Sequence, residues 1–140
     1  MDKRVLPNDV LLPEVAKFLD EGREVELSPK GNSMLPFIRE GKDSVVLKKL
    51  PSVEVGDIVL VKLPGRYVMH RVVDENRNLL TLMGDGNIRG TESCTRDEVL
   101  GTVICIVRGG KRRVKPGKGR WWRVLLPFRR IILGIYRRLI

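Results

Sequence analysis

The sequence has few of the residues that build metal and redox sites. Its 140 residues include two cysteines and one histidine. Cys94 and Cys105 do not form a Cys-x-x-Cys pair, and neither has a histidine close by in the sequence, so they lack the spacing of zinc ligands. We therefore expect two buried free thiols, no metal site and no cofactor.

Long apolar runs are also missing. No segment offers about 18 consecutive apolar residues without charge, so the sequence predicts no ordinary membrane span. The N-terminal stretch MDKRVLPNDVLLPEV lacks the apolar core and the small-residue cleavage site of a secretory signal, and we expect a cytoplasmic protein. The hydrophobic share of 42% and the charged share of 31% are those of an ordinary globular domain, which argues against a disordered chain.

Acidic residues are absent from the C-terminal part of the chain. Residues 108–140 contain 12 Lys and Arg and no Asp or Glu, whereas residues 1–107 contain 15 basic and 17 acidic residues. The body is therefore close to neutral and the tail is strongly basic. Such a tail indicates an anionic partner, such as lipid headgroups, nucleic acid or an acidic protein.

The body reads as one mainly β domain, residues 1–109, that begins with a helix. Residues 9–21 have helical periodicity, with Asn8 or Asp9 as the cap, Pro13 in the first turn and Gly22 after the end. Short β-branched segments separated by turns follow, as in a sandwich or coiled barrel. The predicted strands are residues 25–29, 44–50, 56–63, 66–74, 79–84 and 99–109.

The tail divides into a linker and a helix. Residues 110–120 form a basic, glycine-rich stretch that we expect to lack fixed structure, and residues 121–140 read as a basic amphipathic helix. Arginine on one face, aliphatic side chains on the other and tryptophans at one end are typical of a helix in a membrane interface. A helix that covers an apolar sheet face, or one that docks on nucleic acid or protein, remains an alternative. We favour peripheral contact with the inner face of a membrane over nucleic acid, because the tail is more apolar than phosphate binding requires.

One serine and the single histidine are candidates for nucleophilic chemistry. In GNSMLPFI, residues 31–38, the Gly-Asn pair permits positive φ and can present Ser33 on a sharp bend, although an ordinary hairpin begins in the same way. A serine needs an adjacent base, and His70 in RYVMHRVV can supply one near neutral pH. Asp85 in LMGDGN can orient that histidine, or can simply belong to an Asp-Gly turn.

Four segments together resemble a known family. GNSMLPFI, GDIVLVKL, MHRVV and MGDGN occur in the order of the conserved boxes of type I signal peptidases and LexA-type proteases, the S24/S26-type serine peptidases. The histidine in the third box is similar to the histidine-base members of the family. From the sequence we expect no counterpart of the N-terminal membrane anchor of the signal peptidases. The resemblance implies a coiled, partly open β-barrel of the signal peptidase and LexA catalytic-domain type.

The resemblance also implies roles for individual residues. Ser33 occupies the position of the nucleophile, His70 that of the general base and Asp85 that of the acid in the last box. Histidine-type relatives often carry a further acid a few residues later, and Glu92 is therefore the alternative orienting acid.

The same resemblance places the oxyanion hole and the substrate groove in the first box. The Ser33 backbone N–H would donate one hydrogen bond to the oxyanion. Gly31 stands where many signal peptidases have a serine, so the second donor is unassigned and Asn32 is a candidate. Met34 and Pro36 would shape the turn and the groove.

The sequence thus predicts a serine endopeptidase that cleaves an extended segment of a precursor protein or leader peptide. In the family the substrate lies extended beside exposed strand edges, a mode known as β-augmentation. The alternative is a catalytically inactive peptide-binding or accessory β domain with a membrane- or nucleic-acid-binding basic tail.

Overall fold

The protein is mainly β. The computed structural model describes residues 2–4, 8–28, 34, 37–39, 41–86, 90–119 and 131–135. The elements are β1 (Asp2–Arg4), α1 (Asn8–Asp20), β2 (Val25–Leu27), β3 (Asp43–Lys48), β4 (Ile58–Leu63), β5 (Arg66–Asn76), β6 (Leu79–Met83), β7 (Glu92–Thr95), the 3-10 turn η1 (Arg96–Glu98), β8 (Val99–Arg108) and β9 (Arg112–Val114). Residues 131–135 add a further helical turn.

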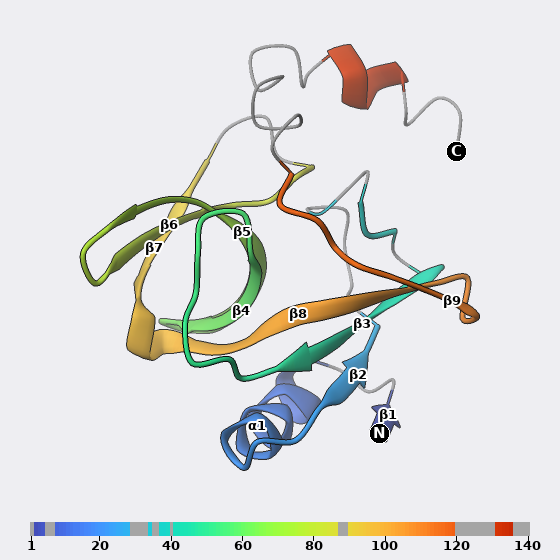
Figure 1. Ribbon diagram of the computed structural model, residues 1–140, viewed down its shortest axis with the longest axis horizontal. Helices are drawn as coiled ribbons and strands as arrows, with labels where there is room; N and C mark the ends of the chain where they lie inside the picture. The colour runs from blue at the N-terminus through green and yellow to red at the C-terminus, as the bar shows by residue number, and fades with distance from the viewer. Residues whose placement is uncertain are drawn as a thin grey trace.

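All described strands belong to one open, coiled sheet (Figure 1). Its order is β1-β2-β3-β8-β4-β5-β6-β7, and β9 pairs with β8 beside this path. The β1–β2 pair is parallel and the other pairs are antiparallel. The ends of the path, β1 and β7, are not paired with each other in the described part of the chain, so the sheet curls without closing.

The curl follows from register shifts in the middle of the sheet. The ladders skip three residues: Ile104 of β8 opposite β3, Leu100 of β8 opposite β4, and Val73 of β5 opposite β6. Such bulges bend a strand and increase its twist. As a result β4 is buried on both faces: Ile58 contributes to one hydrophobic cluster and Val59 to the other.

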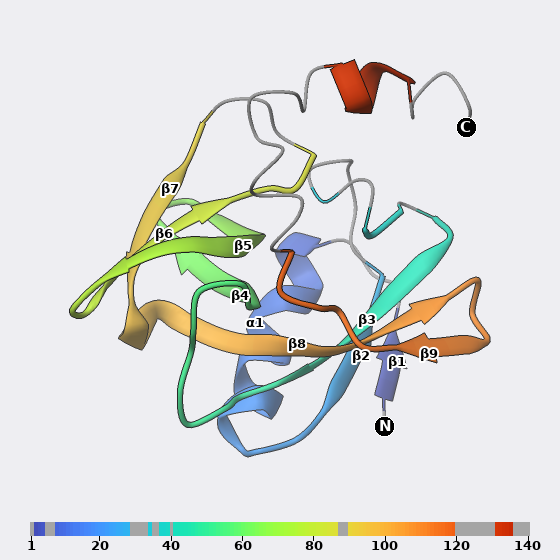
Figure 2. The same cartoon turned by 45° about the horizontal axis from the view of Figure 1, so that its top comes forward.

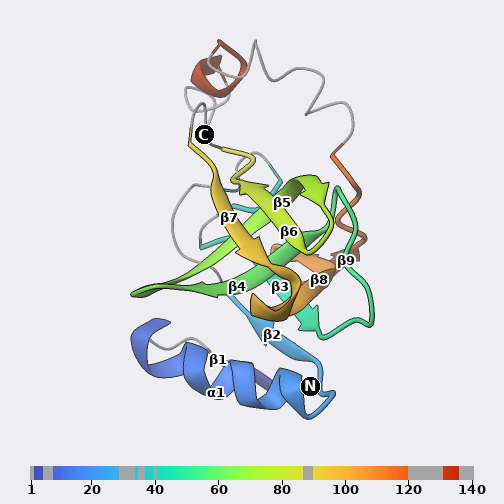
Figure 3. The same ribbon diagram turned by 90° about the vertical axis from the view of Figure 1, so that its left-hand side faces the viewer.

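Helix α1 covers the lower side of the sheet (Figure 3). Its buried residues Val15 and Leu19 pack into the cluster formed by β2, β3 and β8. The helix ends before Gly22, whose φ of +83° is a left-handed conformation that glycine adopts without strain. At Gly101 of β8 the helix approaches closely, because an added Cβ atom would lie 2.9 Å from Leu19 Cδ1.

The predicted fold class is confirmed. Helix α1 begins one residue earlier than expected, which places Pro13 beyond the first turn. Each of the six predicted strands is present within a few residues of its expected bounds. Three short strands, β1, β7 and β9, were not predicted.

The expectation for residues 110–120 is wrong in part. Residues 112–114 form β9, which pairs with β8 in a hairpin that Figure 2 shows at the edge of the sheet. Residues 131–135 are helical, and the rest of the predicted helix 121–140 lies outside the described residues. Across the described ranges, the helices are too short or too polar to cross a bilayer.

We expect the docking of α1 to depend on the absence of a side chain at Gly101. Gly101→Val should lower the free energy of unfolding by about 1–3 kcal/mol, because the new side chain would overpack against the fully buried Leu19. Urea unfolding followed by circular dichroism measures this loss. Adding Leu19→Ala should recover part of it, and a double variant whose loss equals the sum of the two single losses would contradict the contact.

Candidate active site

His70 lies in the middle of the sheet. It belongs to β5, which pairs with β4 on one side and β6 on the other, and its partner on β4 is Val59. The side chain is 9% exposed. Pairing with β4 fixes the backbone of His70, the β6 ladder begins at the next residue, Arg71, and burial limits the freedom of the His70 ring.

Glu92 holds one nitrogen of the His70 ring. The Nδ1 atom lies 2.5 Å from Glu92 Oε1, and the Glu92 side chain is 13% exposed. In the tautomer that carries its proton on Nδ1, the ring donates this hydrogen bond to the carboxylate and Nε2 keeps its lone pair. Arg66, from the start of β5, places a guanidinium nitrogen 3.8 Å from the other Glu92 oxygen.

The strand register explains how Glu92 reaches across β6. Arg71 pairs with Met83, the last residue of β6, so continuing the register by one residue puts Gly84 opposite His70. Gly84 has no side chain that would separate His70 from the start of β7. Glu92 pairs with Leu82, which pairs with Val72, so its side chain reaches His70 diagonally along the face that Val72 and His70 share.

Asp85 binds the neighbouring residue instead of His70. Its carboxylate oxygens accept hydrogen bonds from Arg71 Nε at 2.8 Å and Arg71 Nη2 at 2.7 Å. Both side chains are buried, at 0% and 1% exposure. Successive residues of a strand point to opposite faces, so His70 and Arg71 direct their side chains to different sides of β5.

Arg71 joins three further parts of the chain. Its Nη1 atom donates to the Gly56 carbonyl at 2.8 Å and to the Gly117 carbonyl at 2.9 Å. Its guanidinium also lies over the Phe37 ring, 5.1 Å from the centroid, in cation–π geometry. A buried guanidinium needs several acceptors, and Arg71 finds them in segments far apart in the sequence.

Met34, the residue that follows Ser33, contacts the Arg71–Asp85 pair through Asp85. Met34 is buried, and its Sδ atom accepts a hydrogen bond from the Asp85 backbone N–H at 3.4 Å. The Met34 carbonyl accepts from the backbone N–H groups of Phe37 and Ile38, both at 3.0 Å, which closes a turn. The four sequence boxes therefore meet around Arg71, through Met34, Gly56, Arg71 itself and Asp85.

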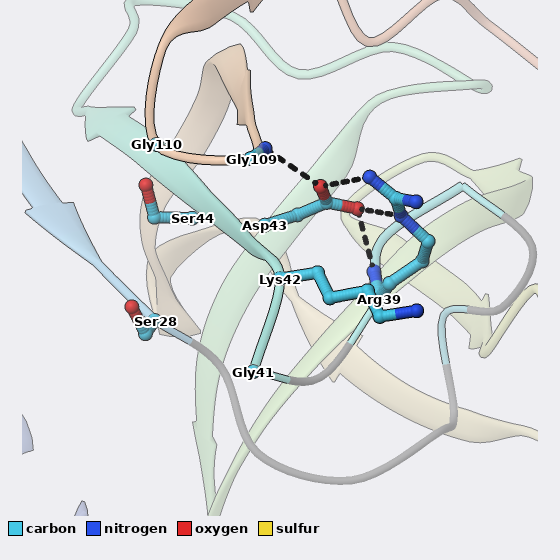
Figure 4. Close-up of a pocket in the computed structure, with 8 residues that line it drawn as sticks. All are labelled: Ser28, Arg39, Gly41, Lys42, Asp43, Ser44, Gly109 and Gly110. Atoms are coloured by element: carbon cyan, nitrogen blue, oxygen red, sulfur yellow. Dashed lines mark hydrogen bonds and ion pairs between the residues drawn. The ribbon is translucent and has the colours of Figure 1, made fainter.

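A second carboxylate anchors the other end of this turn (Figure 4). Asp43 accepts hydrogen bonds from the backbone and guanidinium of Arg39, and a guanidinium nitrogen of Arg108 lies 3.1 Å away. Burial raises the pKa of Asp43, but the hydrogen bonds and charges of the two arginines outweigh it and lower the pKa to about 2. Arg108 also donates to the Phe37 carbonyl at 2.6 Å.

The Asp43 cluster borders a cavity of about 580 Å³. Its remaining lining residues are Ser28, Gly41, Lys42, Ser44, Gly109 and Gly110. Figure 4 shows that the Arg39–Asp43 pair links this cavity to the chain after the first box.

Not every predicted site residue falls within the described part of the chain. Ser33, Asn32 and Pro36 lie outside it. The structure brings His70 together with Glu92, the alternative acid, and places Asp85, the acid favoured first, against Arg71. Met34 is buried and contacts the Asp85 backbone of the last box, and its predicted part in a substrate groove stays a prediction.

Sequence reasoning missed Arg71 as the centre of the site. The available signal was a charged residue inside the apolar run YVMHRVV, since a buried arginine needs a paired acid. The cysteines are free, as expected. Burial raises the pKa of the Cys94 thiol to about 11, and Cys105 is half-buried. No cluster of three or more possible metal ligands occurs within the described ranges.

Removing Asp85 should destabilise the whole domain. Asp85→Ala leaves the buried Arg71 charge without its acid, and we expect a loss of about 3–5 kcal/mol in the free energy of unfolding. Asp97→Ala, at an exposed acid, is the control and should change stability by less than about 0.5 kcal/mol. Urea titrations report both values. Combining Asp85→Ala with Arg71→Met should restore part of the loss, and equal losses in the Asp85 and Asp97 variants would show that the pair does not support the fold.

Comparison with known proteins identifies a family for this chain. No curated protein matches the sequence. Residues 13–104 match the family described as Peptidase S24-like. The match contains all four sequence boxes, together with most of α1, β2 to β7, η1 and most of β8. Because this match spans more than half of the chain, the protein belongs to the Peptidase S24-like family.

Proposed function

We propose that the protein is a serine endopeptidase in which Ser33 is the nucleophile, His70 the general base and Glu92 the orienting acid. The observation that carries the proposal is the contact between His70 Nδ1 and Glu92. Membership of a family named for peptidases supports the reaction class.

The proposed reaction uses the free nitrogen of His70. Nε2 takes the proton of the Ser33 hydroxyl as its oxygen attacks the peptide carbonyl carbon, and the imidazolium returns that proton to the leaving amine. Water then attacks the acyl-enzyme with the same base. Glu92 fixes the ring and stabilises its charged form at each proton transfer, and it remains unprotonated throughout.

The anchored turn after Ser33 supports the assignment of the nucleophile. Met34 is held by Asp85, and Asp85 is held by Arg71, which is covalently next to His70. The nucleophile box and the base therefore share one buried support. A tolerance near 0.5 Å in catalytic geometry requires such a scaffold.

The proposed substrate is an extended segment of a precursor protein or leader peptide. The motif resemblance supports this class, because relatives bind their substrates in extended form beside strand edges.

Mass spectrometry of peptides from cells that produce the wild type or a variant tests this function. Ser33→Ala and His70→Ala should each abolish the processed products, with losses above about 10⁴-fold, and Glu92→Gln should lower their formation by about 10²–10⁴-fold. Ser52→Ala, at an exposed serine, is the matched control and should process normally. Products that persist in Ser33→Ala would overturn the proposal. A folded wild type that changes no cellular peptide would favour a non-catalytic peptide-binding domain.

We also propose that the basic C-terminal segment contacts an anionic membrane surface. In the helical turn 131–135, Leu133 is buried, whereas Ile131 is 65% exposed and Ile135 is 56% exposed. Basic residues near an anionic bilayer contribute about 1 kcal/mol each, and exposed aliphatic residues add insertion into the interface. The excess of basic residues in 108–140 supplies the first of these contributions.

Vesicle binding separates this partner from nucleic acid. Changing Ile131 and Ile135 together to Gln should weaken binding to phosphatidylglycerol vesicles at least about tenfold and leave binding to duplex DNA unchanged. Leu79→Gln, an exposed apolar residue on β6, is the control and should bind like the wild type. Wild-type vesicle affinity in the double variant, or a preference for DNA, would contradict the membrane proposal.

A further inference from the structure

The segment that follows β9 returns to the candidate site. Residues 115–119, here called the strap, leave the β8–β9 hairpin and turn toward β5 (Figures 1 and 2). The Gly117 carbonyl accepts a hydrogen bond from Arg71 at 2.9 Å. The strap belongs to the basic tail, outside the residues that match the family.

Lys118 fixes the strap to the loop before β4. Its ammonium group bonds the Asp57 carboxylate and lies 3.5 Å from Glu54. The hydrogen bond to Asp57 raises the pKa of Lys118 above its ordinary value although burial opposes this, so the group stays charged over the physiological range. The two acids belong to the second sequence box or directly precede it.

Two glycines permit the close approach. A Cβ atom on Gly119 would lie 2.7 Å from Arg71 Nε, and a Cβ atom on Gly56 would lie 2.7 Å from Lys118 Cβ. Any side chain at Gly119 would therefore displace the guanidinium or the strap. Gly117 has almost the same backbone conformation, with φ of +68° against +66°, yet nothing lies within 4 Å of a Cβ atom added there.

The strap completes the burial of Arg71. The guanidinium is bounded by Asp85, the Gly56 carbonyl and the Phe37 ring, and Gly117 and Gly119 lie against it from the tail. The Phe37 ring in turn contacts the buried Leu133 of the helical turn 131–135. Excluding water strengthens an ion pair, because the effective dielectric constant around it falls.

We propose that the strap is a positioning element of the active site, with Lys118 as its anchoring residue. The strap acts through Arg71, because it keeps water from the Arg71–Asp85 ion pair. The ion pair fixes Asp85, and Asp85 in turn fixes the Met34 turn relative to β5, the strand that carries His70. The catalytic consequence rests on the proposed peptidase function. The structural consequence does not.

The hydrogen-exchange rate of the Arg71 Nε–H measures how well the strap keeps water from the ion pair, and it requires no substrate. The proton is identified in NMR spectra by its loss in Arg71→Lys. Gly119→Ala and Lys118→Gln should each speed its exchange at least about tenfold, because both changes admit water to the ion pair. Lys115→Gln is the matched control and should exchange like the wild type, since Lys115 is exposed. Gly117→Ala introduces the same positive-φ strain as Gly119→Ala without the steric contact, so it should speed the exchange less than Gly119→Ala does.

Turnover of a peptide identified in the cellular comparison tests the catalytic part. Lys118→Gln should lower kcat at least about tenfold with little change in KM, because the strap contacts no substrate, and Lys115→Gln should retain the wild-type kcat. Unchanged exchange in both Gly119→Ala and Lys118→Gln would overturn the strap proposal whatever the protein catalyses. Faster exchange with unchanged kcat would overturn the positioning role. Faster exchange together with a wild type that cleaves nothing would reject the peptidase function and leave the strap as a structural clamp.

Discussion

The buried ion pair between Arg71 and Asp85 is the interaction on which the candidate site depends. Neither side chain is exposed to any extent, so each requires the other. Arg71 also donates hydrogen bonds to the carbonyl of Gly56, in the loop before β4, and to the carbonyl of Gly117, in the tail. The Asp85 backbone N–H donates to Met34. Loops that are polar and glycine-rich are thereby fixed around a single guanidinium. The sheet supplies the foundation, because β5 lies between β4 and β6.

The pairing of Arg71 with Asp85 gives different roles to two acids that lie close together in the sequence. Asp85 and Glu92 lie seven positions apart, in one polar segment, yet they face different partners. Asp85 belongs to the support of the site, whereas Glu92 is the acid that can stabilise a charged imidazole. A site built in this way keeps its stability and its proposed chemistry on different faces of β5. The basic tail takes part in the support, because Gly117 accepts a hydrogen bond from Arg71 and Leu133 packs against Phe37.

Particular elements show why the fold was predictable. Segments such as residues 58–63 and 99–108 are long, β-branched and bounded by turns, so their local pattern and their tertiary role agree. Strands β1, β7 and β9 are three or four residues long and contain charged or polar side chains. Their pattern is too short to recognise, and they exist because a neighbouring strand offers hydrogen bonds. The same reason explains why residues 112–114 were expected to be part of a linker.

The sequence by itself determined the mainly β class, the first helix, the order of the four boxes, the concentration of positive charge in the tail and the identity of the single histidine. Only the tertiary structure decided which acid meets that histidine, because the choice depends on where β6 ends and on the register of β5, β6 and β7. It also decided that Arg71 is the common partner of the boxes and that the tail returns to cover it. Such contacts join residues up to 61 positions apart, and no local pattern encodes them.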